Sequence, residues 1–202
     1  MKYKCITGGP ISENCYLLID EKTNQAAVVD PGFLNDVLLN EIKKYTVQRI
    51  LLTHGHFDHI WEADRLHEML GVPVCAYETE AAFAADDKQN GSLLMMYESI
   101  TCKVHEAFKD GETFRIGEVP VTVLHTPGHT SGGVSYITPD AVFTGDTLMG
   151  YSVGRCDLPT GNSAELRESL KKLAALPGNP DICGGHGPVT TLEDEKRRNP
   201  YL

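Results

Sequence analysis

The chain has 202 residues, of which 41% are hydrophobic and 23% are charged, and its formal net charge is −10. These fractions are typical of a soluble globular protein, and a chain of this length most often forms one domain, here residues 1–202. The acidic balance argues against a protein that coats nucleic-acid phosphates, because such proteins depend on clustered Lys and Arg side chains. We therefore expect no nucleic-acid partner.

Two further features concern the cellular setting. No segment is apolar and long enough for a signal peptide or a membrane helix, so we expect a cytoplasmic protein without a membrane partner. The six cysteines are widely spaced and form no Cys-x-x-Cys pair. This spacing favours reduced thiols over disulfide bonds or a thiolate zinc site.

Short strands and turns are expected first along the chain. Residues 15–19 and 25–29 are apolar, β-prone runs, and the second run ends at Asp30-Pro31-Gly32. Apolar spacing then predicts an alternation of helices and strands. The later expected elements are, in chain order, a helix with apolar residues at Val37, Leu38, Ile42 and Tyr45, a strand at 47–52, a helix with Ile60, Ala63, His67 and Leu70 on one side, a strand at 74–77, a helical excursion at 78–99 to which we assign no chemistry, strands at 113–116, 119–124, 134–137 and 141–143, a helix capped by Ser163, and a short strand near Ile182.

Histidines are concentrated in three short motifs, each near glycine, and these motifs contain six of the eight histidines in the chain. His54 and His56 lie two residues apart at the end of the expected 47–52 strand, so their side chains share one face. Asp58 and His59 follow where the next helix should begin. We therefore expect these four side chains to converge.

Imidazole and carboxylate groups are ligands for zinc, iron and manganese, and three more such groups follow later in the chain. His129 and His186 add nitrogen donors, and Asp146 adds a carboxylate able to bridge two ions about 4 Å apart. This set suffices for two divalent ions and is too large for a closed, four-coordinate structural zinc site. The predicted ligands are His54, His56, Asp58, His59, His129, Asp146 and His186, with Asp58 also the candidate catalytic carboxylate.

The remaining histidines receive other roles. His67 lies on an apolar helix face and is expected to be packed or hydrogen-bonded, and His105 stands in a polar turn where solvation is expected. His125 continues the face of the 119–124 strand. We expect it to support His129 rather than bind metal, because a ligating histidine needs an outer partner.

These motifs and their order resemble the metallo-β-lactamase superfamily, and within it the short, single-domain glyoxalase II-like hydrolases and their persulfide dioxygenase relatives. The resemblance implies an α/β fold, an αββα sandwich of two mixed β-sheets flanked by helices. It also implies one metal ion on His54, His56 and His129, a second on Asp58, His59 and His186, Asp146 between them, and Asp30 supporting the ligands from behind. The motifs that carry the resemblance are Asp30-Pro31-Gly32, residues 53–59, residues 125–130, Gly145-Asp146-Thr147 and Gly185-His186-Gly187.

Residues 152–157 resemble the glyoxalase II segment that binds the glycine carboxylate of glutathione, and Arg155 matches its cation. A guanidinium can hold a carboxylate with two hydrogen bonds, so a salt bridge between Arg155 and Asp157 is an equal alternative. Two departures bear on the substrate. Only residues 188–202 follow the last ligand, where glyoxalase II has a helical domain completing its glutathione pocket, and Asp157 replaces an aromatic residue in a Gly-Arg-x-Asp arrangement shared with persulfide dioxygenases.

The leading functional hypothesis is a thioesterase of the glyoxalase II type that cleaves small-molecule S-acyl thiol (hydroxyacylglutathione-like) substrates by a hydroxide bridging two metal ions. A thiol with a pKa of about 8.5 can leave as an anion, whereas an amide nitrogen needs a proton. Zinc is favoured, with iron or manganese as alternatives. Open alternatives are an iron-dependent persulfide dioxygenase, against which His186 argues, a lactonase or esterase, and a metal-binding module without turnover. The oligomeric state, including a homo-oligomer, stays open.

Overall fold

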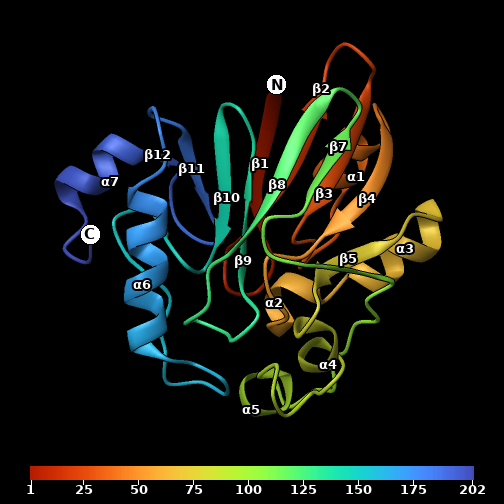
Figure 1. The fold of residues 1–202 in the computed structure, drawn as a ribbon. Helices are drawn as coiled ribbons and strands as arrows, with labels where there is room; N and C mark the ends of the chain where they lie inside the picture. The colour runs from red at the N-terminus through yellow and green to blue at the C-terminus, as the bar shows by residue number, and fades with distance from the viewer.

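The computed structural model describes residues 1–202 and contains two six-stranded β-sheets packed face to face, with helices on their outer sides (Figure 1). This is the expected αββα sandwich. The first sheet has the order β1 (Lys2–Gly8), β2 (Glu13–Asp20), β3 (Gln25–Val29), β4 (Thr46–Leu51), β5 (Val74–Tyr77) and β6 (Glu106–Phe108). The second has the order β12 (Thr190–Thr191), β11 (Asp181–Gly184), β10 (Ala141–Gly145), β9 (Val134–Ile137), β8 (Val119–His125) and β7 (Thr113–Ile116). The helices are α1 (Asp36–Ile42), α2 (Phe57–Ile60), α3 (Ala63–Leu70), α4 (Glu80–Ala84), α5 (Ser92–Met95), α6 (Ser163–Ala174) and α7 (Leu192–Arg198).

Both sheets are mixed. Strands β1, β2 and β3 pair antiparallel, and β3 to β6 pair in parallel. In the second sheet β9 runs opposite to both β8 and β10, while β10 and β11 are parallel. Strands β8, β10 and β11 therefore point the same way, and the loops that follow them emerge at one edge of the sandwich.

Strand β2 shows how the core is divided, because all eight of its residues are buried. Leu17 and Ile19 point into the cluster under the helices of the first sheet, whereas Tyr16 and Leu18 point between the two sheets. The Tyr16 ring meets Phe143 of the second sheet edge to face, with centroids 5.4 Å apart. A strand covered on both faces needs apolar residues throughout, which explains its continuous apolar run.

The strands that the apolar pattern does not predict are β1, β6 and β12, which all lie at sheet edges. Strand β1 has no buried residue, and β6 has one, Phe108. Edge strands pack on fewer neighbours, so their composition carries a weaker hydrophobic signal. Periodicity therefore detects the centre of each sheet better than its borders.

Three expected helices differ in detail from the structure. The expected helix with Ile60, Ala63, His67 and Leu70 on one side is divided into α2, which ends at Ile60, and α3, which begins at Ala63. In α6 the N-cap is Asn162 and not Ser163, since the Asn162 side chain accepts hydrogen bonds from the backbone N–H groups of Ala164 and Glu165. In α1, Leu38 and Ile42 are buried as expected, but Val37 is 61% exposed, so the apolar face is narrower than predicted.

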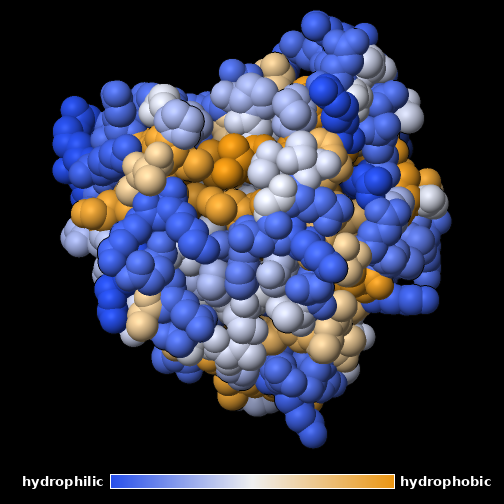
Figure 2. Space-filling view, in the orientation of Figure 1, coloured by the Kyte–Doolittle hydropathy of each residue, from blue (hydrophilic) through white to orange (hydrophobic).

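Helix α7 was not predicted, although its charges explain it. Acidic residues occupy its first turn and basic residues its last turn. This order complements the helix dipole, and the Thr191 side chain caps the first turn by accepting from the Asp194 backbone N–H at 3.3 Å. None of the helices combines the length and apolar composition needed to cross a bilayer. Figure 2 shows a mostly hydrophilic face with apolar residues gathered in a band across its upper half.

Candidate metal centre

The predicted ligands follow the ends of strands at one edge of the sandwich, the edge at which Figure 1 shows α2. The loop after β4 continues into α2 and carries four of them, while single ligands follow β8, β10 and β11. The two sheets are joined at this edge, because the Val134 backbone N–H donates to the Thr53 carbonyl at 2.9 Å. Loops that are distant in the sequence thus meet because these strand ends share one edge.

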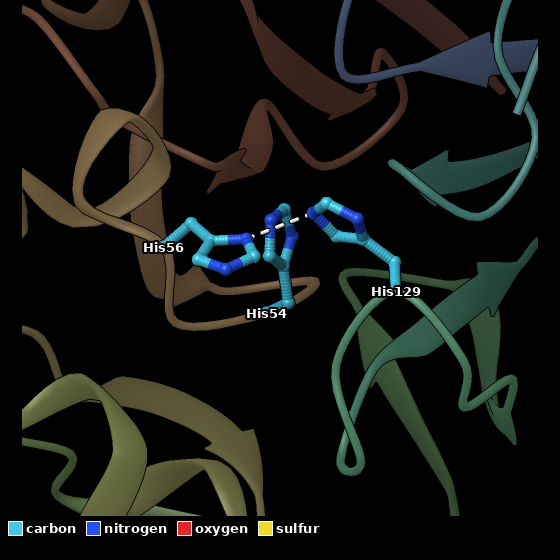
Figure 3. A group of neighbouring side chains, drawn as sticks. All are labelled: His54, His56 and His129. Carbon is cyan, nitrogen blue, oxygen red and sulfur yellow. Dashed lines mark hydrogen bonds between the residues drawn. The ribbon is translucent and has the colours of Figure 1, made fainter. Parts of the chain in front are cut away.

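The first group consists of His54, His56 and His129, whose ligand atoms all lie within 4.8 Å of one another. Figure 3 shows the three rings converging from two loops, with His54 and His56 on one and His129 on the other. The Nδ1 atom of His56 is 2.8 Å from Nε2 of His129. All three side chains are buried. We call these residues the first ligand group.

The second group consists of Asp58, His59 and His186, again with ligand atoms within 4.8 Å of one another. Oδ2 of Asp58 is 3.1 Å from Nε2 of His186 and 3.3 Å from Nε2 of His59. The His186 side chain is 25% exposed, so this group borders solvent. We call these residues the second ligand group.

Asp146 lies between the two groups. Its Oδ2 is 3.5 Å from Nε2 of His129 and 3.7 Å from Nε2 of His186, while its Oδ1 is 3.5 Å from Nε2 of His59. One carboxylate therefore approaches both groups, which is the geometry of a bridging ligand.

The polar atoms of this cluster fit metal ions. Nε2 of His54, Nε2 of His59 and Oδ1 of Asp146 are buried without a hydrogen-bond partner. Buried polar atoms are normally satisfied, so these atoms call for a further partner. Two donors bound at about 2.0–2.2 Å to one tetrahedral ion lie roughly 3.3–3.6 Å apart. The separations of 3.3 Å between Asp58 and His59 and of 3.5 Å from Asp146 to His59 and to His129 lie in this range, whereas the 2.8 Å between His56 and His129 is shorter. A Cβ atom on Gly185 would lie 2.2 Å from Asp146 Oδ1, so only glycine leaves this space open.

Protonation states also suit metal binding. Burial, together with neighbouring histidines, lowers the pKa of His54 well below its usual value and the pKa of His56 to about 3. Burial opposes the charged form of Asp146, but His59 and His129 outweigh it and lower its pKa to about 2. The pKa of Asp58 is likewise well below its usual value, because His59 and His186 outweigh its burial. His54 and His56 are therefore neutral imidazoles and both carboxylates are charged near neutral pH, whereas the nearby Asp58 and Asp146 outweigh burial and raise the pKa of His59 and His186.

Asp30 lies behind the second ligand group, where the resemblance places it. Its Oδ2 is 3.1 Å from Nδ1 of His59 and accepts from the Thr53 hydroxyl at 2.6 Å, while its Oδ1 accepts from the Thr53 backbone N–H at 2.7 Å. If Nδ1 of His59 donates to Asp30, its Nε2 is left unprotonated toward the cluster. Asp30 has a φ of 51°, a left-handed conformation in which Asp is tolerated better than most residues.

The outer partner of His129 is not His125, contrary to expectation. Nδ1 of His129 is 2.7 Å from the carbonyl oxygen of Arg155. His125 instead contacts the Ser131 carbonyl at 2.9 Å through Nε2 and stacks on Tyr77. His125 therefore bonds across the loop that carries His129 but does not contact the His129 side chain. Composition gives no signal for a backbone carbonyl as partner.

The other two histidines are remote from the cluster. Nδ1 of His67 is 2.8 Å from the Val72 carbonyl, which agrees with the predicted hydrogen-bonded role. His105 is exposed, as expected, and its ring stacks on His67 with centroids 3.9 Å apart.

Glu80 supports the loops of the first ligand group, a role that the sequence pattern does not indicate. It lies in residues 78–99, where no chemistry was expected. It is 1% exposed, and its carboxylate accepts from the backbone N–H groups of Gly55 at 2.7 Å and Gly132 at 2.9 Å. Gly55 separates His54 from His56, and Gly132 follows the His129 loop. Glu80 thus holds together the two loops of the first ligand group.

The ligand groups face a pocket of about 190 Å³, which we call the metal pocket. Its apolar walls include Ile11, Met149 and Leu158, together with Met95 from the region assigned no chemistry. Arg155 also lines it, and its guanidinium donates from Nε and Nη2 to the Asp157 carboxylate at 2.6 and 2.7 Å. The structure therefore contains the expected alternative, a salt bridge between Arg155 and Asp157, at the border of the metal pocket.

Comparison with known proteins agrees with this architecture. Residues 8–186 match the model of the metallo-β-lactamase superfamily. The probable metallo-hydrolase YqgX of Bacillus subtilis is 37% identical over 208 residues, covering 100% of this chain and 98% of that protein. The hydroxyacylglutathione hydrolase GloC of Haemophilus influenzae is 31% identical over 209 residues, covering 100% of this chain and 98% of that protein.

Three solved structures share the whole fold. The B3 metallo-β-lactamase BLEG-1 superposes with a TM-score of 0.93 at 34% identity, covering 100% of this chain and 99% of that one. TTHA1623 in a di-iron-bound form has a TM-score of 0.84 at 34% identity, with coverages of 98% and 100%. ETHE1 from Myxococcus xanthus has a TM-score of 0.81 at 31% identity, with coverages of 99% and 84%. The chain therefore belongs to the metallo-β-lactamase superfamily and is a metallo-hydrolase of that superfamily, whose fold and histidine cluster indicate a two-metal site.

Proposed function

We propose that this protein is a glyoxalase II-like thioesterase that hydrolyses small-molecule S-acyl thiol substrates at a centre of two divalent metal ions, with zinc favoured. The observation that carries the proposal is the pair of ligand groups sharing Asp146 at the base of an open pocket. The relative GloC, named as a hydroxyacylglutathione hydrolase, supports this substrate class.

The ligand roles follow the two groups. In this proposal His54, His56 and His129 hold one ion and the second ligand group holds the other, with Asp146 between them. Bound ions supply a Lewis acid and a water whose pKa falls from about 15.7 to about 7. Asp30 orients His59, the Arg155 carbonyl orients His129, and Glu80 fixes the loops.

The protonation states of Asp58 and Asp146 favour a substrate whose leaving group is a thiolate. Asp58 and Asp146 both have lowered pKa values, so both are charged at neutral pH and neither can donate a proton to a departing amine. A thiol with a pKa of about 8.5 departs without such a proton, whereas an amide nitrogen requires one. We therefore assign Asp58, the candidate catalytic carboxylate, to holding positive charge at the reaction centre rather than to acid catalysis.

One alternative retains specific support. The sequence motifs also resemble those of persulfide dioxygenases, and TTHA1623, which shares the whole fold at 34% identity, has been solved in a di-iron-bound form. A mononuclear oxygenase does not need the second ligand group, and here that group is complete. We therefore rank persulfide oxidation second, and lactone, ester or β-lactam hydrolysis after it.

The test combines metal analysis with three assays on freshly purified protein. We expect two divalent ions per chain by elemental analysis, release of thiol from S-lactoylglutathione, no oxygen uptake with glutathione persulfide and little turnover of a β-lactam. Replacing His186 with Ala should remove one ion and most thioester hydrolysis. One iron per chain with oxygen consumption and no hydrolysis, or β-lactam turnover without thioester turnover, would overturn the proposal.

A further inference from the structure

A second pocket adjoins the metal pocket and is larger, about 600 Å³ against about 190 Å³. It lies between α6, residues 153–156 and residues 200–201 near the C-terminus, and we call it the α6 pocket. Figure 1 shows the C-terminus beside α6. Its volume lies within the range of about 300–1,000 Å³ typical of small-molecule sites, whereas the metal pocket is below that range. A substrate with a sizeable thiol carrier must therefore extend beyond the metal pocket.

The two pockets share Gly154 and Arg155 in their walls. The backbone of this short segment is tied to the metal centre, because the Arg155 carbonyl contacts His129 and the Gly154 N–H donates to the Asp146 carbonyl at 2.8 Å. The Arg155 side chain, which borders both pockets, is 54% exposed. A ligand that occupied both pockets would therefore lie along Gly154 and Arg155.

The lining combines apolar surface with one unpaired cation, because Arg155 is paired with Asp157. Val153, Leu166 and Leu170 supply apolar surface, and the only charged residues in the lining are Arg155 and Arg167. The Arg167 guanidinium has no ion pair and no hydrogen bond, in a chain with 18 basic and 28 acidic residues. A free guanidinium above an apolar floor matches a ligand that carries a carboxylate on a partly apolar body.

The C-terminal wall of the pocket is held in place. Asn199 is 4% exposed, and its side-chain amide donates to the Ser152 carbonyl at 3.1 Å and to the Glu195 carboxylate at 2.8 Å. Pro200 and Tyr201 follow directly and line the pocket. The C-terminal segment therefore closes a pocket beside Arg155.

We propose that the α6 pocket binds the anionic end of the thiol carrier of the substrate, with Arg167 as the anchoring cation. This inference rests on the proposed thioesterase function, since it concerns the non-reacting part of the same substrate. The ligand class is a thiol whose body bears at least one carboxylate. Arg167 acts on substrate selection and does not contact the reacting atoms.

The test compares two thioesters with the same acyl group on the metal-loaded enzyme, S-lactoylglutathione and the uncharged S-lactoyl-N-acetylcysteamine. The preference for the glutathione thioester is measured as the ratio of the two kcat/KM values. We expect Arg167→Ala to lower this ratio about tenfold, because KM for the glutathione thioester rises. A tenfold change corresponds to about 1.4 kcal/mol. Lys171→Ala is the matched control, because Lys171 lies on the same helix, is 71% exposed and pairs with Glu168 outside the pocket. An unchanged preference in Arg167→Ala, or an equal change in Lys171→Ala, would overturn the assignment.

A binding measurement separates this inference from the proposed function. Calorimetric titration with S-methylglutathione, whose blocked sulfur cannot bind metal as a thiolate, should show binding to the wild type that weakens about tenfold in Arg167→Ala. Binding lost in Arg167→Ala without hydrolysis of either thioester would reject the thioesterase and retain the pocket. Hydrolysis of both thioesters without binding of S-methylglutathione would reject the pocket and retain the thioesterase.

Discussion

The two ligand groups of the metal centre differ in charge and in contact with solvent. The first ligand group has three histidines and no carboxylate, and none of its side chains is more than 7% exposed. The second contains Asp58, and its His186 side chain is 25% exposed. The first group is thus a buried, neutral set of nitrogen donors, and the second is a charged set at the edge of the pocket.

The same difference appears in the protonation of the imidazoles. Burial lowers the pKa of His54 and His56. Burial acts in the same direction on His59 and His186, but the carboxylates of Asp58 and Asp146 outweigh it and raise both pKa values. Because a metal binds only the unprotonated nitrogen, protons compete more strongly for the second ligand group. Two sites that share one bridging residue should therefore hold their ions with different pH dependence.

Replacing the shared residue should have the largest effect. Asp146→Asn removes the charge that approaches both groups, so we expect loss of both ions and a fall in kcat/KM of roughly 10³ or more, since metal catalysis is worth several kcal/mol. Elemental analysis and the thioester assay measure this. Asp36→Asn, an exposed residue in the first turn of α1, is the control. Retention of one ion would show that Asp146 serves only one group.

Acidification should separate the two groups. The raised pKa values of His59 and His186 mean that protons occupy these nitrogens at a higher pH than they occupy His54 and His56. As pH falls, the metal content after dialysis should drop first from two ions per chain to one, and then to zero. His186→Ala should show only the second step. Loss of both ions at one pH would mean that the groups do not differ as described.

Replacing the residues that support the metal ligands should have the smallest effects, and each replacement should weaken the binding of one ion only. Glu80→Gln disturbs the loops of the first ligand group, and Asp30→Asn disturbs the orientation of His59 in the second. Outer partners of metal ligands typically contribute about 10–100-fold in metal affinity. Competition with a chelator should show that Glu80→Gln weakens one ion and Asp30→Asn the other. If both variants weaken the same ion, the assignment of these supports is wrong.

The central strands and the edge strands differ in how clearly their sequences indicate a strand. The ends of the central strands were predicted to within two residues, because strands buried on both faces have continuous apolar runs. Of the four edge strands, β7 was predicted, whereas β1, β6 and β12 were not, because their composition carries a weaker apolar pattern. The cap of α6 was misplaced by one residue, since Asn162 and Ser163 are both good N-caps and only the hydrogen bonds distinguish them.

The sequence by itself determined the residues that gather at the metal centre, from His54 to His186, because ligand chemistry depends on side-chain type and strand ends are recognisable from apolar runs. Only the tertiary structure decided their outer partners. Glu80 reaches Gly132 and the Arg155 carbonyl reaches His129 through contacts between loops far apart in the chain, and no local pattern encodes such contacts. The α6 pocket likewise depends on tertiary structure, because a helix, a loop and the C-terminal residues form it only when they are packed together.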